Sequence, residues 1–305
     1  MNERPGTRMS LGGGRVTSDH CGRAILMIVL SGLSFSLVAV MVRFAGDVPI
    51  CEKVFFRSVV MLGAMGAVAI RSRENPFARS PRLPLLILRG VFGTIAMFLY
   101  FFAIERLTIA DATVLNKLSP FFVTMFAVLF LHEKLSRYIV PVLVVAFAGA
   151  ALIIKPQFNL EALPAVGGLV SAAASGAAYT VVRFLRGDEP PYRLVFYFSL
   201  VSVAVALPPM LVNFVRPEGM QWAYLIGGGV FATTGQMALT LGYHQAPVTR
   251  VSIYVYAHIL FAFLWGLALW GEMPDALSIV GTVLIILAAV YNYRKVFADT
   301  ATSTG

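Results

Sequence analysis

The feature that most constrains the fold of this chain is a series of ten apolar runs. Each is roughly 17–22 residues long, close to the ~20 residues that span a hydrocarbon core. They lie near residues 24–44, 53–70, 84–104, 110–131, 138–154, 164–182, 194–214, 221–242, 251–270 and 276–293. Several contain glycine or proline, which membrane helices tolerate. The connections are too short for a second folded domain. The sequence therefore predicts an all-α membrane protein with ten transmembrane helices.

The composition excludes most soluble classes of protein. Of the 305 residues, 58% are hydrophobic and only 13% are charged, whereas a soluble domain is about 25% charged. A soluble enzyme and a disordered chain do not fit this composition. The two cysteines, Cys21 and Cys51, are too few for a disulfide framework. We expect the lipid bilayer to be the surface that this chain contacts.

The distribution of basic residues predicts how the chain is oriented. Net charge is +9, from 24 Lys and Arg against 15 Asp and Glu. With both termini in the cytoplasm, sixteen of the 24 lie on the inner side, four on the outer side and four within the spans. This bias follows the positive-inside rule, and it explains the charge without nucleic acid. We expect a multi-pass protein of a bacterial-type inner (plasma) membrane, with Cys21 inside and Cys51 outside, too far apart to form a disulfide.

The two ends of the chain are predicted to be tails. Residues 1–22 are polar and contain three consecutive glycines, so we expect a disordered cytoplasmic tail. A signal peptide is the alternative, but the run at 24–44 is too long for one, and its end carries Arg43 in place of a small-residue cleavage site. Residues 296–305 form the second predicted cytoplasmic tail.

An internal repeat is the most informative pattern in the chain. Four pairs of matching segments share an offset of 139 or 140: 90–94 with 229–233, Phe122 with Phe261, Glu133 with Glu272 and 41–44 with 181–184. We expect one five-helix repeat at 23–155 and another at 156–295. Because five is odd, the second copy enters the membrane inverted, an arrangement typical of secondary transporters that bind near the midplane. No GxxxxGK[ST] motif is present to bind ATP.

These features resemble the EamA-type branch of the drug/metabolite transporter superfamily. The resemblance rests on the 5+5 repeat and on an element from Ala103 through Ala110 and Ser119-Pro120 to Glu133-Lys134-Leu135, echoed from Gly242 to Glu272. It covers almost the whole chain beyond the first tail. It implies a ten-helix inner-membrane carrier, often an exporter, of metabolites such as amino acids, amino-acid-derived metallophores, riboflavin or S-adenosylmethionine. The second copy has Ile259 where Pro120 would map, which argues against symmetric kinks in the fourth and ninth spans.

The fourth span contains the strongest candidate site. An ionised side chain at mid-bilayer costs about 2.5–3.5 kcal/mol, and Lys117 lies roughly 10 Å into the span at 1.5 Å per residue. Pro120 removes a backbone donor and crowds the carbonyl of Asn116. With the Asn116 amide and the Ser119 hydroxyl these groups form a polar break that predicts a binding site for an anionic group of the substrate. The alternative is a lysine that extends to the outer interface beside a structural kink.

The ninth span supplies the pseudo-symmetric partner. Tyr254, His258, Phe261 and Trp265 fall on one helical face, and the repeat maps His258 onto Ser119. We expect Tyr254 and His258 to line the cavity; a structural histidine is the alternative. Gln236 in the eighth span contacts either substrate or a neighbouring helix.

Other charged residues near the spans have simpler interpretations. Arg57 and Arg89 act in gating or substrate binding, or extend to the two interfaces. Arg43 is expected to be an interfacial anchor, and Glu133 and Glu272 to be turn and cap residues. No carboxylate lies deep in any predicted span. The excess of cations favours a substrate with a carboxylate or phosphate.

The sequence thus predicts a secondary transporter. The histidines show no metal-ligand spacing, and no nucleophile–base arrangement stands out. We therefore expect that the protein binds no metal and no cofactor and is not an enzyme. The leading hypothesis is export of a small anionic or zwitterionic metabolite. An uptake facilitator for a vitamin or nucleoside-like metabolite, of the riboflavin or S-adenosylmethionine type, is the alternative, and a membrane scaffold comes third. Monomer and homodimer are both left open.

Overall fold

Every regular element that the structure describes is a helix. The structure is a computed structural model, and it describes residues 18–78, 80–131, 139–154, 162–185, 188–245 and 252–302. The elements in chain order are α1 (Ser18–Phe44), α2 (Ile50–Arg71), α3 (Leu83–Arg106), α4 (Ile109–Asn116), α5 (Ser119–Leu131), α6 (Ile139–Ile154), α7 (Leu163–Phe184), α8 (Pro191–Val212), α9 (Gln221–Gln245), the 3₁₀ helix η2 (Ser252–Tyr256), α11 (Ala257–Trp270) and α12 (Ala276–Thr302).

The helices confirm an all-α membrane protein. Eight segments within the described residues are long and apolar enough to cross a membrane. Of the two remaining predicted spans, 138–154 corresponds to α6, an apolar helix of 16 residues. The run at 221–242 corresponds to α9, a helix of 25 residues that is not among the eight. The count of ten spans therefore stays a prediction.

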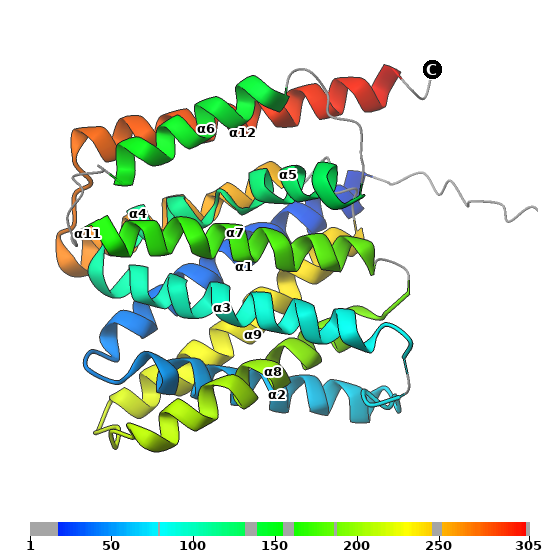
Figure 1. Ribbon diagram of the computed structural model, residues 1–305, viewed down its shortest axis with the longest axis vertical. Coiled ribbons are helices and arrows are strands. Elements are labelled where there is room, and N and C mark those ends of the chain that lie inside the picture. Colours follow the sequence, from blue (N-terminus) through cyan, green and yellow to red (C-terminus); the bar gives the residue numbers. More distant parts are fainter. Residues whose placement is uncertain are drawn as a thin grey trace, which may run out of the picture.

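The ends of the helical region extend into both predicted tails. α1 begins at Ser18, and α12 continues to Thr302 rather than ending near 295. Residues 1–17 lie outside the described part of the chain. Figure 1 shows the start of α1 and the end of α12 at the same end of the bundle, on the right of the view. A chain that crosses the membrane an even number of times has both of its ends on the same side.

The pairing of the helices has the symmetry expected of two equivalent repeats: it stays the same when the two predicted repeats are exchanged. α1 packs on α9 and α3 on α7, while α2 packs on α8 and α6 on α12. Exchange of the repeats converts the α1–α9 pair into the α7–α3 pair and leaves the other two pairs unchanged. In Figure 1, α6 and α12 form a layer at the top that covers α4, α5, α7 and α11.

Glycines allow several of these helices to approach closely, as is common in membrane proteins. A Cβ added to Gly149 of α6 would lie 2.6 Å from the Gly281 carbonyl oxygen of α12, and one on Gly281 would lie 2.5 Å from the Gly149 oxygen. A Cβ on Gly229 of α9 would lie 2.6 Å from the Val60 Cβ of α2. The glycine run at 227–229 thus lies at a helix-packing surface, against Met41 of α1 and Val60 of α2.

One end of the bundle, which we call the Glu272 end, joins loops and helices through carboxylates. Glu272 forms an ion pair with Arg43 at the end of α1, and its Oε2 accepts a 3.0 Å hydrogen bond from the backbone N–H of Ile109. Lys53 Nζ lies 2.6 Å from Glu105 Oε1. Arg43 is thus tied to an acid instead of serving only as an interfacial anchor. Glu272 is a cap as predicted, but of α4, far away in the sequence; Glu133 lies outside the described residues.

The opposite end, which we call the Glu189 end, joins the 72–82 segment to the start of α8. Arg193 Nη1 lies 2.7 Å from Glu189 Oε2, and the Tyr192 hydroxyl donates a 2.6 Å hydrogen bond to Glu74. Both bundle ends therefore carry their own polar contacts between sequence-distant segments.

Candidate functional site

The helical winding changes in both the fourth and the ninth predicted spans, at equivalent positions. α4 ends at Asn116 and α5 begins at Ser119, with Lys117 as the C-cap of α4. In the ninth span the 3₁₀ helix η2 ends at Tyr256, and α11 begins at Ala257. An offset of 139 carries Lys117 onto Tyr256. In the ninth span the winding changes from 3₁₀ to α without a proline. The expectation from Ile259 that the two spans are not kinked symmetrically stays a prediction.

The two breaks contact each other. The Tyr256 hydroxyl donates a long hydrogen bond, 3.5 Å, to the backbone carbonyl of Lys117. The N-terminus of α5 lies here, and the N-terminus of a helix carries partial positive charge that favours anions. We call Lys117, Ser119, Tyr256 and His258 the break region.

Lys117 and His258 are the two side chains of the break region that can carry positive charge. Lys117 is half-buried, and its amine forms no hydrogen bond or ion pair to a described residue. His258 is only 3% exposed, and neither ring nitrogen has a partner of ordinary hydrogen-bond geometry among the described residues. Tyr256, which contacts the Lys117 carbonyl, lies two residues before His258 in the chain. The structure thus brings these two predicted site residues together.

A close backbone approach holds His258 in place. A Cβ on Gly32 of α1 would lie 3.1 Å from the backbone nitrogen of His258 and 3.3 Å from its Cα. The ring centroids of Phe35 and His258 lie 6.3 Å apart. Because Gly32 has no side chain, α1 lies directly against the start of α11.

Asn116 connects three helices. Its Nδ2 donates a 3.0 Å hydrogen bond to the Ser171 hydroxyl on α7, which donates in turn to the Ala96 carbonyl of α3 at 2.8 Å. This chain of bonds occupies the amide that the sequence assigned to substrate. Ser119 is buried, and Pro120 is exposed in the first turn of α5, where a missing N–H is tolerated.

The aromatic face predicted for the ninth span does not form as one continuous stripe. Tyr254 lies in η2, whose winding differs from that of α11, and is 39% exposed. Trp265 instead donates from Nε1 to the Ser36 hydroxyl of α1 at 3.2 Å. Gln236 is half-buried on α9, and no contact given for the described residues joins it to Lys117 or His258. Whether Tyr254 and Gln236 touch substrate stays a prediction.

Arg57 and Arg89 converge on one aromatic ring inside the bundle. Arg57 of α2 is 9% exposed and Arg89 of α3 is 5% exposed. Their guanidinium carbons lie 6.0 Å and 4.1 Å from the ring centroid of Phe198 on α8. The interpretation that these arginines extend to opposite interfaces is therefore wrong. We call Arg57, Arg89 and Phe198 the arginine region.

Several donors of the arginine region have no partner. Arg57 Nη1 contacts the Met97 sulfur, but Arg57 Nε and the Nε and Nη1 of Arg89 are buried without a hydrogen-bond partner among the described residues. A Cβ on Gly93 would lie 2.8 Å from the Phe198 ring and 3.2 Å from Arg89 Nη1. Gly93 therefore makes the space that both groups occupy.

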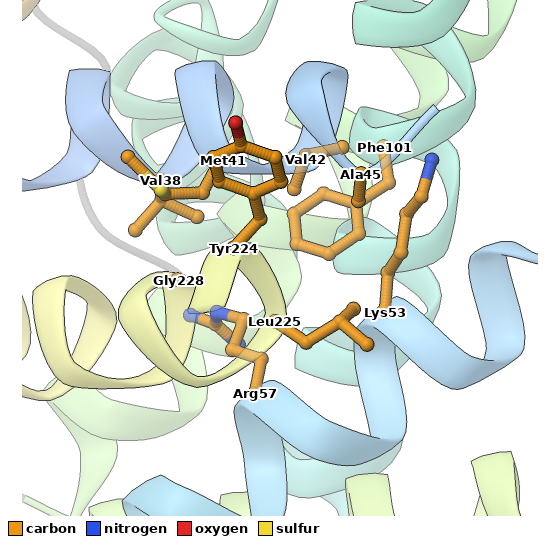
Figure 2. A pocket seen from close by; sticks show the side chains of 10 residues that line it. All are labelled: Val38, Met41, Val42, Ala45, Lys53, Arg57, Phe101, Tyr224, Leu225 and Gly228. Atoms are coloured by element: carbon orange, nitrogen blue, oxygen red, sulfur yellow. The ribbon is translucent and has the colours of Figure 1, made fainter. Parts of the chain in front are cut away.

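A small cavity lies beside Arg57, between α1, α2, α3 and α9 (Figure 2). Its interior has room for about one water molecule. Figure 2 shows the guanidinium nitrogens of Arg57 on the side of Leu225 and Gly228, whereas Lys53 extends in a different direction. Lys53 is already paired, with Glu105 and with the Gly46 carbonyl at 2.8 Å. Arg57 is thus the cation of this cavity that has no ion pair among the described residues.

Sequence reasoning missed Glu52, which is fully buried in the first turn of α2. Its Oε1 accepts a 2.7 Å hydrogen bond from the backbone N–H of Val215, and its Oε2 has no partner among the described residues. The sequence placed Glu52 just outside the second apolar run, so no pattern there signalled its burial. No group of three or more His, Cys, Asp or Glu among the described residues is placed to hold a metal.

Comparison with known proteins places this chain among membrane transporters. The model of the EamA-like transporter family matches residues 22–155 and 163–294. The pseudopaline exporter CntI of Pseudomonas aeruginosa, strain UCBPP-PA14, is 36% identical over 275 residues, which cover 89% of this chain and 96% of that protein. Solute carrier family 35 member G1 of Mus musculus is 26% identical over 286 residues, covering 88% of this chain and 77% of that protein.

A solved structure supports the fold. One crystal structure matches with a TM-score of 0.62 at 20% sequence identity, and the match covers 90% of this chain and 99% of that one. At this identity the likeness concerns the arrangement of helices and not the ligand.

Proposed function

The chain belongs to the EamA-like transporter family, and we propose that it is a secondary transporter that exports a small anionic or zwitterionic metabolite. An amino acid or an amino-acid-derived metallophore fits this description. The exported molecule binds in the break region, between the fourth and ninth spans. Transport proceeds by alternating access, in which two inverted five-helix repeats move around this site.

The helix pairing supports the inverted repeats. α1–α9 and α3–α7 are exchanged when the repeats are exchanged, and α2–α8 and α6–α12 each join equivalent helices. Lys117 and Tyr256 are equivalent by the offset of 139, and they contact each other. A residue that touches its own counterpart lies near a pseudo-twofold axis, which is where inverted-repeat transporters bind substrate.

The observation that carries the proposal is the Lys117 ammonium of the break region, which has no acidic partner among the described residues. The buried imidazole of His258 adds a polar group to the same region, and α5 begins two residues after Lys117. An isolated charge in a membrane is costly, and a ligand of opposite charge removes that cost. Lys117 binds the negative group; Ser119 and His258 contact the rest of the molecule.

The names of two relatives support the proposed direction of transport. Proteins 36% identical to this chain are named exporters of pseudopaline, so we assign export and a bacterial-type inner membrane with both termini in the cytoplasm. Uptake of a vitamin or nucleoside-like ring is the second candidate. The half-exposed Tyr254 and the aromatic residues of α11 favour it, because they offer surfaces on which a ring stacks.

Transport across proteoliposomes tests the proposal. Purified protein is reconstituted and movement of amino acids, pseudopaline, riboflavin and S-adenosylmethionine is measured in both directions. We expect an anionic or zwitterionic compound to move, and Lys117→Ala to reduce its kcat/KM about tenfold or more, since a charged hydrogen bond contributes about 1.5–3 kcal/mol.

Lys295→Ala is the matched control, because Lys295 is an exposed lysine on α12. It should transport like the wild type. Unchanged transport of the anionic compound by Lys117→Ala would refute the assigned site. Riboflavin as the one transported compound would favour uptake of a ring-bearing metabolite instead.

A further inference from the structure

We propose that the arginine region is a second anion subsite, in which Arg57 and Arg89 bind a carboxylate of the transported molecule beside the ring of Phe198. The inference rests on the proposed transport function and makes it more specific. A molecule held by Lys117 at one carboxylate and by the two arginines at another carries at least two acidic groups. The substrate class is therefore a small organic compound with two or more carboxylates.

The first argument is the number of donors that the protein leaves unused. Three buried N–H positions, Arg57 Nε and the Nε and Nη1 of Arg89, have no partner among the described residues. Each such group costs about 1–3 kcal/mol, and more when it is charged. A carboxylate with two oxygens matches the planar fork of an arginine. The donors of the pair are thus arranged for an acceptor that the described residues do not provide.

The second argument is that the fold itself does not require these arginines. In the second repeat, the residues equivalent to Arg57 are Phe196 at an offset of 139 and Tyr197 at an offset of 140. The residue equivalent to Arg89 at an offset of 139 is Gly228. The corresponding helices α8 and α9 form without a cation at those positions. Gly93, which makes room for Arg89 Nη1, corresponds to Ala232. The charge therefore belongs to one repeat alone, as expected of a ligand site on a pseudo-symmetric scaffold.

The third argument is position. Arg57 lines the cavity between α1, α2, α3 and α9 (Figure 2), which gives an anion a route to its guanidinium when these helices move. Neighbouring residues of α3 reach the two regions: Met97 contacts Arg57, and Ala96 accepts the bond from Ser171 that continues to Asn116. The same helix, α3, thus contacts Arg57 directly and Asn116, the neighbour of Lys117, through Ser171.

Ligand-induced thermal stabilisation in detergent tests the subsite without requiring transport. The probes are glutarate and propane-1,2,3-tricarboxylate, with glutaramide as the uncharged analogue and acetate as the monocarboxylate, all at constant ionic strength. We expect both polycarboxylates to raise the unfolding temperature of the wild type and glutaramide to leave it unchanged. Arg57→Gln/Arg89→Gln should need about tenfold or more of either polycarboxylate for the same shift.

Arg106→Gln is the matched control, since Arg106 also lies on α3, stacks 4.2 Å from the Phe102 ring centroid, and is exposed. It should respond like the wild type. If the double glutamine variant does not fold, Arg57→Lys/Arg89→Lys keeps both charges without the fork and should be weakened several-fold. An equal response of wild type and arginine variants, or no response of the wild type to either polycarboxylate, would overturn the subsite. Polycarboxylate binding through the arginines in a protein that transports nothing would refute the transport proposal alone.

Discussion

The break region and the arginine region place positive charge inside the membrane in different ways. The break region lies where two helices are interrupted, and both repeats contribute to it through Lys117 and Tyr256. The arginine region lies on uninterrupted stretches of α2, α3 and α8, and its two cations come from the first repeat alone. Helix ends supply positive potential through the backbone, whereas Arg57 and Arg89 supply it through side chains.

The difference shows how a repeated scaffold acquires an asymmetric site. The break recurs in the second repeat even though the proline does not. The cations do not recur: Lys117 corresponds to Tyr256 and Arg89 to Gly228. The backbone geometry is thus shared between the repeats, and the charge that selects a ligand is added to one of them.

Gly32→Val should disrupt the break region and have the largest effect. The new side chain would meet the His258 backbone, which lies 3.1–3.3 Å from an added Cβ, and overpacking of this kind costs about 1–3 kcal/mol. We expect a clear fall in unfolding temperature and loss of transport. Gly63→Val is the control, because nothing lies within 4 Å of a Cβ there. Equal stability of the two variants would show that the contact of α1 with α11 is not tight.

Asn116→Ala should lower stability by about 1–2 kcal/mol, because it leaves Ser171 without its donor. If the amide serves helix packing, KM of the transported compound stays near its wild-type value. A double-mutant cycle with Ser171→Ala separates the cases, since a shared bond makes the two losses less than additive. A large rise in KM with normal stability would instead place Asn116 in the substrate site.

Without any added anion, Arg193→Gln should lower the stability of the protein, whereas Arg89→Gln should leave it unchanged or raise it. Arg193 pairs with Glu189 at 2.7 Å, so its loss should cost about 1 kcal/mol. Arg89 has no carboxylate partner among the described residues, so its loss should leave the unfolding temperature unchanged or higher. A marked destabilisation by Arg89→Gln without any added anion would identify a purely structural cation.

Pro120→Ala should have the smallest effect, below about 1 kcal/mol. The equivalent break at Tyr256 forms without proline, and Pro120 occupies a first-turn position of α5. Transport and unfolding temperature should both stay close to those of the wild type. A strong loss of transport would show that the two breaks have different origins.

Much of the fold was predictable because membrane helices are long, apolar and regularly spaced. The runs near 53–70 and 84–104 correspond to α2 and α3 within a few residues. The interior of the site was less predictable. Hydropathy places Arg57 near one interface and Arg89 near the other, but it carries no information on helix tilt or on a shared neighbour such as Phe198. The winding of η2, which removes Tyr254 from the face of His258, likewise has no counterpart in the apolar pattern.

The contact between Gly149 and Gly281 has a consequence for how this sequence can vary. Each glycine faces the other's carbonyl oxygen at a distance that admits no methyl group. Neither position can gain a side chain, even with a second substitution in the facing helix, because the obstacle is a backbone oxygen that no substitution removes. A saturation library scored for surviving protein should therefore retain glycine alone at both positions, while exposed neighbours such as Val144 and Leu287 accept most apolar residues.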